Sequence, residues 1–359
     1  MTHKTIIFFC IAIFIATAHI IFCCTGIRLL AEDDTIIYAR TLEWRKNLNP
    51  HAVVIPRNMF YTGTSIDNKK GLQWKSLYAF TGITIDDLPF VIDGVNEHGL
   101  AAGLFSFRDD VEYHTPDSNS THNDLAPWEL ITYILSMCRT VEEIKNIIST
   151  IKIVPVFFEI VDEIPPLHYI VHDKDGYCVV LEHAHNSINI YDNPLGIITN
   201  SPNFDWHITH LDTYLNPSFD NHKISSFADL KKMFAPYKTL HESYALGLPS
   251  DFSSSSRFIR AAVYTLCSPT PATGYLGILQ AFHILNQFDI PKGSFRTSQE
   301  DYFTYTHWTS AVNITEKKYY FRTHENQRIR MIDLTKTDYN SCNILWFSMD
   351  TPEDIETLV

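Results

Sequence analysis

Two adjacent cysteines, Cys23 and Cys24, follow an apolar N-terminal segment at the point where a leader peptide would be cut. A cut between them would leave Cys24 with a free α-amine beside its thiol. An α-amine has a pKa of about 7.7–8.0, so at neutral pH part of it can accept the thiol proton. One residue would then supply both the nucleophile and the base of an acyl transfer. From position alone, a buried small cysteine is an equally good interpretation.

The N-terminal segment has the pattern of an export signal. Lys4 supplies a basic start, and an almost unbroken apolar run follows to Cys24. The run is close to the roughly 20 residues that span a bilayer, so a retained anchor is the alternative. We predict a signal peptide over residues 1–23 and a periplasmic or secreted mature protein. Ile21 is bulkier than a cleavage site prefers, and Phe22 argues against a lipoprotein signal.

The composition describes one large globular domain over residues 24–359, with no low-complexity linker. A formal net charge of −13 argues against nucleic-acid partners and against attraction to anionic membrane surfaces. With the leader cut, no stable membrane insertion is expected. The remaining cysteines are odd in number and lack C-x-x-C spacing, which argues against a disulfide scaffold.

Familiar catalytic and metal-binding motifs are absent: there is no G-x-S-x-G, P-loop, G-x-G-x-x-G or H-E-x-x-H. His207 and His210 form an H-x-x-H, but no cysteine or carboxylate cluster completes a metal site. We interpret them as hydrogen-bonding histidines and expect neither a metal nor an organic cofactor.

The strands around Cys24 must position it. Residues 25–44 read as a hairpin with a turn at 31–34, which places Cys24 at the exposed start of the first strand. Residues 90–107 predict a strand to Asp93, a turn to Gly99 and a second strand. Residues 168–193 predict a three-stranded meander with a turn at "DKDG".

Helices are predicted between these strands by apolar residues at helical spacing. Thr140 and Glu143 form a capping-box pattern at the start of one of them. The last quarter returns to strands, so blocks of strands and helices alternate along the chain. This order, with alternating strand patterns, predicts an α+β fold with antiparallel sheets. The predicted helices cover residues 126–138, 140–151, 225–237, 254–267 and 273–288, and the later strands lie within 304–323, 328–334 and 343–349.

The sequence from Cys24, CTGIRLLAEDDTIIYARTLEW, resembles the start of the choloylglycine hydrolase family. That family includes penicillin V acylases, conjugated bile salt hydrolases and acid-ceramidase-like amidases, and its mature chains begin with Cys. Similarity in five ordered segments, covering nearly the whole mature chain, is hard to obtain by chance. The other four segments are residues 93–105, 198–206, 247–262 and 305–323.

The resemblance implies the four-layer αββα sandwich of the N-terminal nucleophile hydrolases, with two antiparallel sheets. It implies an exported amidase that cleaves linear C–N amide bonds through an acyl-thioester on Cys24. Asn200 matches the side-chain donor to the oxyanion, and the backbone N–H of Phe105 matches the second donor. Arg40 and Arg257 match two arginines near the nucleophile, where a cation lowers the thiol pKa.

One matched position departs from the family. Glu43 stands where most relatives have Asp, the carboxylate that orients the new N-terminus, and Glu is one methylene longer. Trp44 next to it could line the acyl pocket, and a half-buried strand Trp is at least as often plain core.

The resemblance leaves the substrate open among small-molecule N-acyl amides. Bile salt hydrolases often carry Asn where Phe105 falls, while penicillin V acylases carry an aromatic residue, which favours an aromatic or aliphatic acyl group. A conjugated bile salt or an N-acyl homoserine lactone is the alternative substrate. A non-enzymatic alternative is an anchored binding protein with an uncleaved leader. Relatives are often tetramers, so a homo-oligomer is possible.

Overall fold

The computed structural model describes residues 23–108, 110–117, 119–214, 247–296 and 303–359. The predicted leader, apart from Cys23, and the predicted helix at 225–237 lie outside these residues. Within the described ranges, no helix is both long enough and apolar enough to cross a bilayer.

The first sheet joins the two ends of the described chain. Its strand order is β1-β2-β15-β16-β17, with the short strand β14 (Phe295–Arg296) also pairing with β15, and every pair is antiparallel. The N-terminal hairpin therefore lies directly beside strands formed some 260 residues later. The strands are β1 (Thr25–Leu30), β2 (Ile36–Trp44), β15 (Phe303–Asn313), β16 (Lys318–Thr323) and β17 (Arg330–Asp333).

The second sheet has the strand order β13-β12-β11-β8-β7-β6-β3-β18, again antiparallel throughout. A separate antiparallel hairpin and a short parallel pair lie outside this sheet and pack against each other. The strands are β3 (Pro50–Ile55), β6 (Phe80–Ile85), β7 (Asp93–Asn96), β8 (Ala101–Ser106), β11 (Leu167–His172), β12 (Cys178–Ala184), β13 (Ser187–Asp192) and β18 (Leu345–Ser348). The hairpin is β4 (Phe60–Thr64) with β5 (Lys70–Lys75), and the parallel pair is β9 (Asp124–Leu125) with β10 (Lys152–Ile153).

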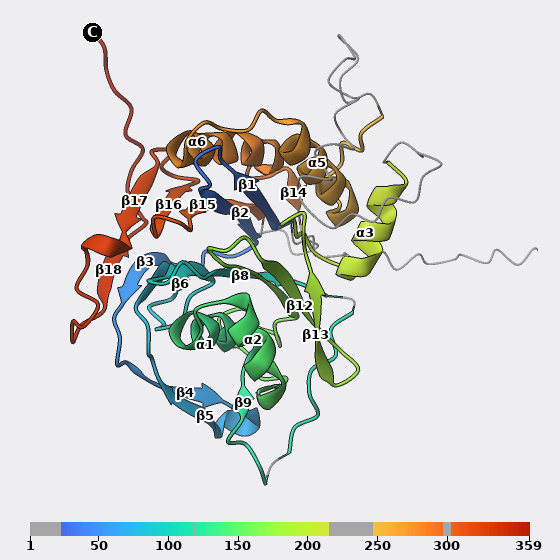
Figure 1. Ribbon diagram of the computed structural model, residues 1–359, viewed down its shortest axis with the longest axis vertical. Helices are drawn as coiled ribbons and strands as arrows, with labels where there is room; N and C mark the ends of the chain where they lie inside the picture. The colour runs from blue at the N-terminus through green and yellow to red at the C-terminus, as the bar shows by residue number, and fades with distance from the viewer. Residues whose placement is uncertain (1–22, 109, 118, 215–246, 297–302) are drawn as a thin grey trace, which may run out of the picture.

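Helices cover the outer faces of both sheets, which gives four layers (Figure 1). Two pack on the first sheet and two lie over the second, while a further helix, α3 (Phe204–Asp212), packs against α5. The α+β class with two antiparallel sheets between helical layers is confirmed. The helices are α5 (Ser254–Cys267) and α6 (Gly274–Leu285) on the first sheet, and α1 (Leu130–Met137) and α2 (Val141–Ile147) on the second.

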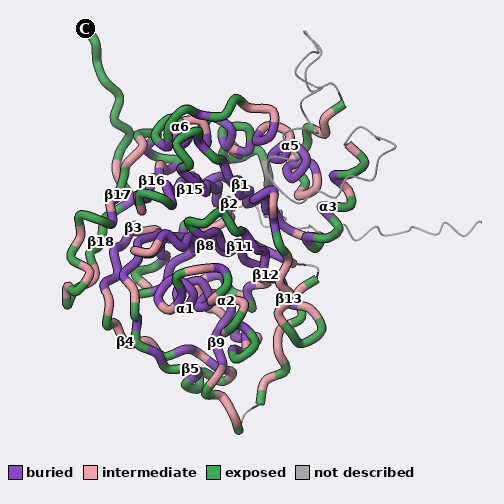
Figure 2. Tube along the Cα trace, viewed as in Figure 1, coloured by how far each residue is buried: buried purple, intermediate pink, exposed green. Residues whose placement is uncertain are grey.

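The two sheets share one hydrophobic core, seen in Figure 2 as buried chain between the helical layers. Strand β2 is buried on both faces, because α6 covers one face and the second sheet covers the other. Its side chains therefore do not alternate between core and solvent, unlike the alternation that the sequence suggested.

Several predicted elements match the structure closely. Helices α5 and α6 fall within their predicted ranges, and the meander β11–β13 matches its predicted range except that β11 begins one residue earlier, at Leu167. At α2, Thr140 accepts a hydrogen bond from the Glu143 backbone N–H at 3.2 Å, as the capping pattern predicts.

Other expectations need correction. The strand expected to end at Asp93 instead begins there, because Asp93–Asn96 pairs with β6 and β8. The four strands between residues 50 and 85 and helix α3 were not predicted.

Candidate active site

Cys24 lies immediately before β1 and is only 5% exposed, so the expectation of an exposed strand start is wrong. Gly26 explains the burial. Gly26 and Ile198 exchange backbone hydrogen bonds of 2.8 and 3.1 Å, and a Cβ on Gly26 would lie 2.7 Å from Ile198 Cγ2. Glycine therefore permits the segment ending at Asn200 to dock beside Cys24.

Arg40 is fully buried on β2, where it pairs with Gly26 across the hairpin. Its Nη1 donates to the Leu104 carbonyl at 2.6 Å, and its guanidinium lies 4.2 Å from the centre of the Phe105 ring. Nη2 has no hydrogen-bond partner among the described residues, and Arg40 lines the same cavity as Cys24. A buried cation with a free donor thus faces the candidate nucleophile.

The Cys24 thiol requires a base at neutral pH. Burial raises its pKa above the ordinary value, while the positive charge of Arg40 lowers it. The Cys24 nitrogen in the uncut chain is a peptide nitrogen bonded to Cys23, so it has no basic lone pair. Cleavage before Cys24 would create the amine that the thiol lacks.

Glu43 is fully buried at the far end of β2. Its Oε1 accepts a 2.7 Å hydrogen bond from Thr306 Oγ1, and its Oε2 accepts a 3.1 Å bond from Thr41 Oγ1. Thr41 Oγ1 in turn accepts from the Thr25 backbone N–H at 3.3 Å. Burial raises the pKa of Glu43 to about 8, against the effect of these hydrogen bonds.

Arg257, on the first turn of α5, clamps the chain around Cys24. Its Nη1 donates to the carbonyl oxygens of Cys23 and Cys24, at 2.8 and 2.5 Å, and to Thr25 Oγ1 at 3.0 Å. Its Nη2 donates to Asn200 Oδ1 at 2.7 Å. Arg257 therefore joins the nucleophile to the predicted oxyanion donor through one buried side chain.

Asn200 has one side-chain hydrogen to spare. Nδ2 carries two hydrogens and donates one to the Ser106 carbonyl at 2.9 Å, while Oδ1 accepts from Arg257. Among the residues that the structure describes, none accepts the other hydrogen, which can therefore meet a substrate oxygen. Phe105 lies in β8 opposite His168, and donation from its backbone N–H to the substrate stays a prediction.

The cavity at Cys24 is small and apolar, with a volume of about 60 Å³. Trp44 is half-buried and lines it, together with Arg40 and Phe105. A water-sized group needs roughly 10–15 Å³ of such space, so the cavity holds only a few heavy atoms. Larger acyl groups require its walls to move.

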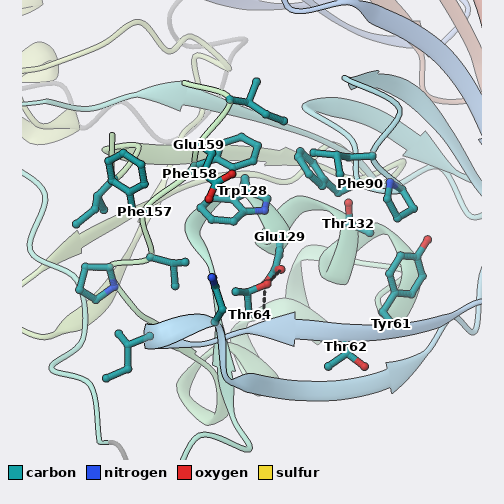
Figure 3. Close-up of a pocket in the computed structure, with 18 of the residues that line it drawn as sticks. Tyr61, Thr62, Thr64, Phe90, Trp128, Glu129, Thr132, Phe157, Phe158 and Glu159 are labelled. Atoms are coloured by element: carbon teal, nitrogen blue, oxygen red, sulfur yellow. Dashed lines mark hydrogen bonds between the residues drawn. The ribbon is translucent and has the colours of Figure 1, made fainter. Parts of the chain in front are cut away.

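A larger cavity of about 800 Å³ lies on the other side of one wall (Figure 3). Phe90, Trp128 and Phe158 line both cavities, and the Trp128 and Phe158 rings stack with centres 4.2 Å apart. Glu129 lines the large cavity, where burial raises its pKa to about 7, and it accepts hydrogen bonds from the N–H and hydroxyl of Thr64. Phe90, Trp128 and Phe158 thus form an aromatic partition between the cavity at Cys24 and the larger cavity.

The H-x-x-H pair does not converge on one point. His207 is buried and its Nε2 donates to the Asn200 carbonyl at 2.8 Å, whereas His210 stacks on Trp206. Within the described ranges, no three His, Cys, Asp or Glu side chains form a group that could hold a metal ion.

The structure brings Arg40, Glu43, Asn200 and Arg257 together around Cys24 at the start of β1. Sequence reasoning missed the groups that support them: Thr306, Ser106 and Ser254. Thr306 pairs with Glu43 next to a bulge in β15, and no local sequence pattern predicts that bulge. Ser254 is the first residue of α5 and follows the N-cap residue Ser253. The serine-rich run before Arg257 was the sequence feature that could have indicated a hydrogen-bonding serine here.

Residues 24–347 match the family model described as linear amide C–N hydrolases, choloylglycine hydrolase family, and the match begins at Cys24. The chain is 31% identical over 324 residues to the bile salt hydrolase/transferase of Clostridium perfringens, covering 89% of this chain and 95% of the relative.

Solved structures share the fold. A variant of the conjugated bile acid hydrolase from Clostridium perfringens superposes with a TM-score of 0.76 at 27% identity, covering 94% of this chain and all of the other. Penicillin V acylase from Agrobacterium tumefaciens gives a TM-score of 0.71 at 21% identity, covering 90% and 91%. These likenesses confirm the αββα sandwich of the N-terminal nucleophile hydrolases.

Proposed function

The chain belongs to the choloylglycine hydrolase family of linear amide C–N hydrolases, and we propose that Cys24 is its nucleophile after removal of residues 1–23. The observation that carries this proposal is the convergence of two arginines, a carboxyl group and an amide donor on one buried cysteine. The mature amine and thiol then supply the base and the nucleophile, without a cofactor.

The reaction runs in two halves. The Cys24 amine takes the thiol proton, and the sulfur attacks the substrate carbonyl carbon to give a tetrahedral oxyanion. The resulting ammonium donates its proton to the departing amine nitrogen as the C–N bond breaks, which leaves an acyl-thioester. A water molecule, deprotonated by the same amine, attacks the thioester and releases the acid with return of the thiol.

Each neighbouring group has a defined part in this scheme. The free Nδ2 hydrogen of Asn200 stabilises the oxyanion, with the Phe105 N–H as the predicted second donor. Arg40 stabilises the thiolate, and Arg257 fixes the chain that carries it. Glu43 orients the mature N-terminus, whose positive charge would favour the ionised carboxylate.

We propose an aromatic or aliphatic acyl group, as in penicillin V acylases. Phe105 and the aromatic partition at the Cys24 cavity support a flat apolar group, which packs well against aromatic rings. A conjugated bile salt is the second candidate, and the relative named bile salt hydrolase/transferase supports it. An N-acyl homoserine lactone remains a further alternative, and a substrate panel of all three distinguishes them.

The test compares two cysteine variants. We expect Cys24→Ala to abolish hydrolysis of phenoxyacetyl and glycine-conjugated amides, because it removes the nucleophile. Cys23→Ala should alter only the processing of the leader. Hydrolysis by Cys24→Ala at the wild-type rate would show that the proposal is wrong.

We further propose that the protein is exported and acts outside the cytoplasm, either in the periplasm or secreted. The basic and apolar pattern of residues 1–23 supports this. A homo-oligomer, such as a tetramer, is part of the same proposal. An anchored binding protein with an intact leader is the opposing case, and the mass of the exported chain separates the two.

A further inference from the structure

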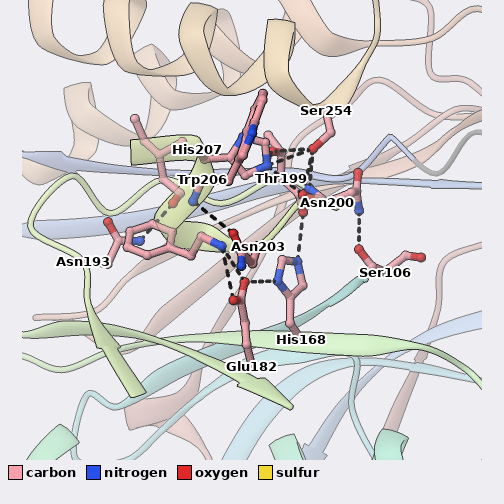
Figure 4. A network of polar contacts seen from close by, with 12 residues as sticks. Ser106, His168, Glu182, Asn193, Thr199, Asn200, Asn203, Trp206, His207 and Ser254 are labelled. Atoms are coloured by element: carbon pink, nitrogen blue, oxygen red, sulfur yellow. Dashed lines mark hydrogen bonds and ion pairs between the residues drawn. The ribbon is translucent and has the colours of Figure 1, made fainter. Parts of the chain in front are cut away.

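A buried polar network surrounds the backbone of Thr199 and Asn200 (Figure 4). His168 on β11 and Glu182 on β12 are both almost fully buried, and His168 Nδ1 lies 3.0 Å from Glu182 Oε1. On the other side of the ring, Nε2 lies 3.2 Å from the Thr199 carbonyl oxygen. Neither residue takes part in the bond-breaking steps described above.

The partners determine where the protons are. A carbonyl oxygen can only accept, so His168 Nε2 carries a hydrogen and donates it to Thr199. The Nδ1–Oε1 contact is a hydrogen bond that requires one further proton, on the ring nitrogen or on the carboxyl oxygen. Both oxygens of Glu182 also accept from the Phe204 backbone N–H, at 3.0 and 3.2 Å, which fixes the carboxyl group at the start of α3.

The hydrogen bond from His168 acts on the peptide unit that carries Asn200. The Thr199 carbonyl and the Asn200 N–H belong to one planar peptide group. His168 holds its oxygen end, while Ser254 Oγ accepts from its N–H end at 2.9 Å. The next carbonyl, that of Asn200, accepts from Ser254 Oγ and from His207 Nε2, both at 2.8 Å.

His168 also contacts the strand that carries the second predicted donor. It lies opposite Phe105 in the β8–β11 ladder, and its ring stacks on Phe107 with centres 4.7 Å apart. One buried side chain is therefore in contact with both segments that would meet the oxyanion.

We propose that His168, held by Glu182, is a positioning residue that fixes the Thr199–Asn200 peptide, so that the free Nδ2 hydrogen of Asn200 points at the oxyanion. This inference rests on the proposed function. Its physical basis is preorganisation: a donor that is already fixed needs no rearrangement when charge develops in the transition state. A small displacement of such a donor lowers kcat while leaving substrate binding nearly unchanged.

Two isosteric variants separate positioning from mere filling of space. His168→Gln places an amide N–H near the position of Nε2 and keeps the bond to Thr199. His168→Asn places its amide near Nδ1, so it keeps a partner for Glu182 and loses the bond to Thr199. We expect kcat to fall by about 10- to 100-fold in H168N, with KM within about twofold of wild type, and to be largely retained in H168Q.

His183→Phe is the matched control. His183 is buried in the same sheet, and neither of its ring nitrogens has a hydrogen-bond partner in the part of the chain that the structure describes. This variant should keep the wild-type kcat. The rate of Cys24 alkylation by iodoacetamide, measured on each mature variant, should stay unchanged, because the oxyanion donor has no part in that reaction.

The outcomes are distinct. Wild-type kcat in H168N, equal losses in H168N and H168Q, or a loss confined to KM would overturn the positioning role while leaving the proposed function in place. A mature wild-type enzyme that alkylates normally but hydrolyses no amide would contradict the proposed function, and this inference with it.

Discussion

Arg257 Nη1 donates a 2.8 Å hydrogen bond to the carbonyl oxygen of Cys23, across 234 residues of sequence. The same nitrogen bonds the Cys24 carbonyl, and Nη2 bonds Asn200. One guanidinium therefore holds the peptide bond that must be cut, the chain that carries the nucleophile, and the amide that would receive the substrate oxygen.

Arg257→Lys should lower kcat by about 100-fold and the free energy of unfolding by roughly 2–4 kcal/mol. The reason is that a lysine ammonium cannot make the hydrogen bonds of both Nη1 and Nη2 of the planar guanidinium. Arg260→Lys is the control. Arg260 lies one turn further along α5 and donates to the carbonyls of Pro249 and Asp251, away from Cys24. Steady-state kinetics and urea unfolding of both variants measure the difference. Equal losses of kcat would show that Arg257 acts only on stability.

Asn200→Ala should lower kcat by about 10²- to 10³-fold, since it removes a donor to the oxyanion. The iodoacetamide reactivity of Cys24 should persist. Asn193→Ala is a suitable comparison, because Asn193 is also buried and, among the described residues, its side chain bonds only within its own turn, to Gly196 and Ile197. The N193A protein should lose stability and keep kcat. An N200A enzyme with near wild-type kcat would exclude the side-chain amide as oxyanion donor.

Glu43 should make the stability of the uncut chain pH-dependent. Its pKa is raised from 4.5 to about 8 by burial, so between these values the folded chain binds a proton that the unfolded chain has released. Stability from this group is therefore present below about pH 4.5 and lost as the pH rises toward 8.

The measurement is urea unfolding at pH 5 and pH 8 of chains that keep Cys23 and carry Cys24→Ala, with and without Glu43→Gln. We expect the unfolding free energy to fall more steeply with pH when Glu43 is present, by on the order of 3 kcal/mol. Titration of the histidines is common to both chains and cancels. Parallel pH profiles would contradict a raised pKa at Glu43.

Phe158→Ala should shift acyl selectivity toward larger groups. Phe158 lines both the small cavity at Cys24 and the large cavity beside it, so its removal would connect them. Phe157→Ala is the matched control, because Phe157 is half exposed and lines only the large cavity. We expect kcat/KM for a long or fused-ring acyl amide to rise relative to an acetyl amide in F158A alone. The same change in both variants would argue against the aromatic partition.

Local patterns predicted much of this molecule. The N-terminal hairpin, the meander around "DKDG" and the capped helices follow from turn residues and apolar spacing, which act within a few positions. Four strands between residues 50 and 85 were not predicted, because their burial depends on partners elsewhere in the fold. Helix α3 was also missed, although Asn203 caps it by accepting from the Trp206 N–H.

The site itself depended on ordered family motifs more than on local pattern. Arg40, Glu43, Asn200 and Arg257 were named from the resemblance, and the structure places them around Cys24. The contacts that hold them were not predictable, because they join distant segments: Thr306 to Glu43 across a bulge, and Ser254 to Asn200. Burial of Cys24 likewise follows from the docking of Ile198 on Gly26, which the hairpin alone does not reveal.

The intact mass of the active enzyme tests the central claim most directly. Purified protein should be resolved into its processed and unprocessed forms, and each form assayed on the same amide substrate. We expect the active form to have the mass of residues 24–359, with a free Cys24 amine, and the form that retains Cys23 to be inactive. Full activity in a chain that still begins before Cys24 would contradict the account, because its Cys24 nitrogen would remain an amide and could not act as the base.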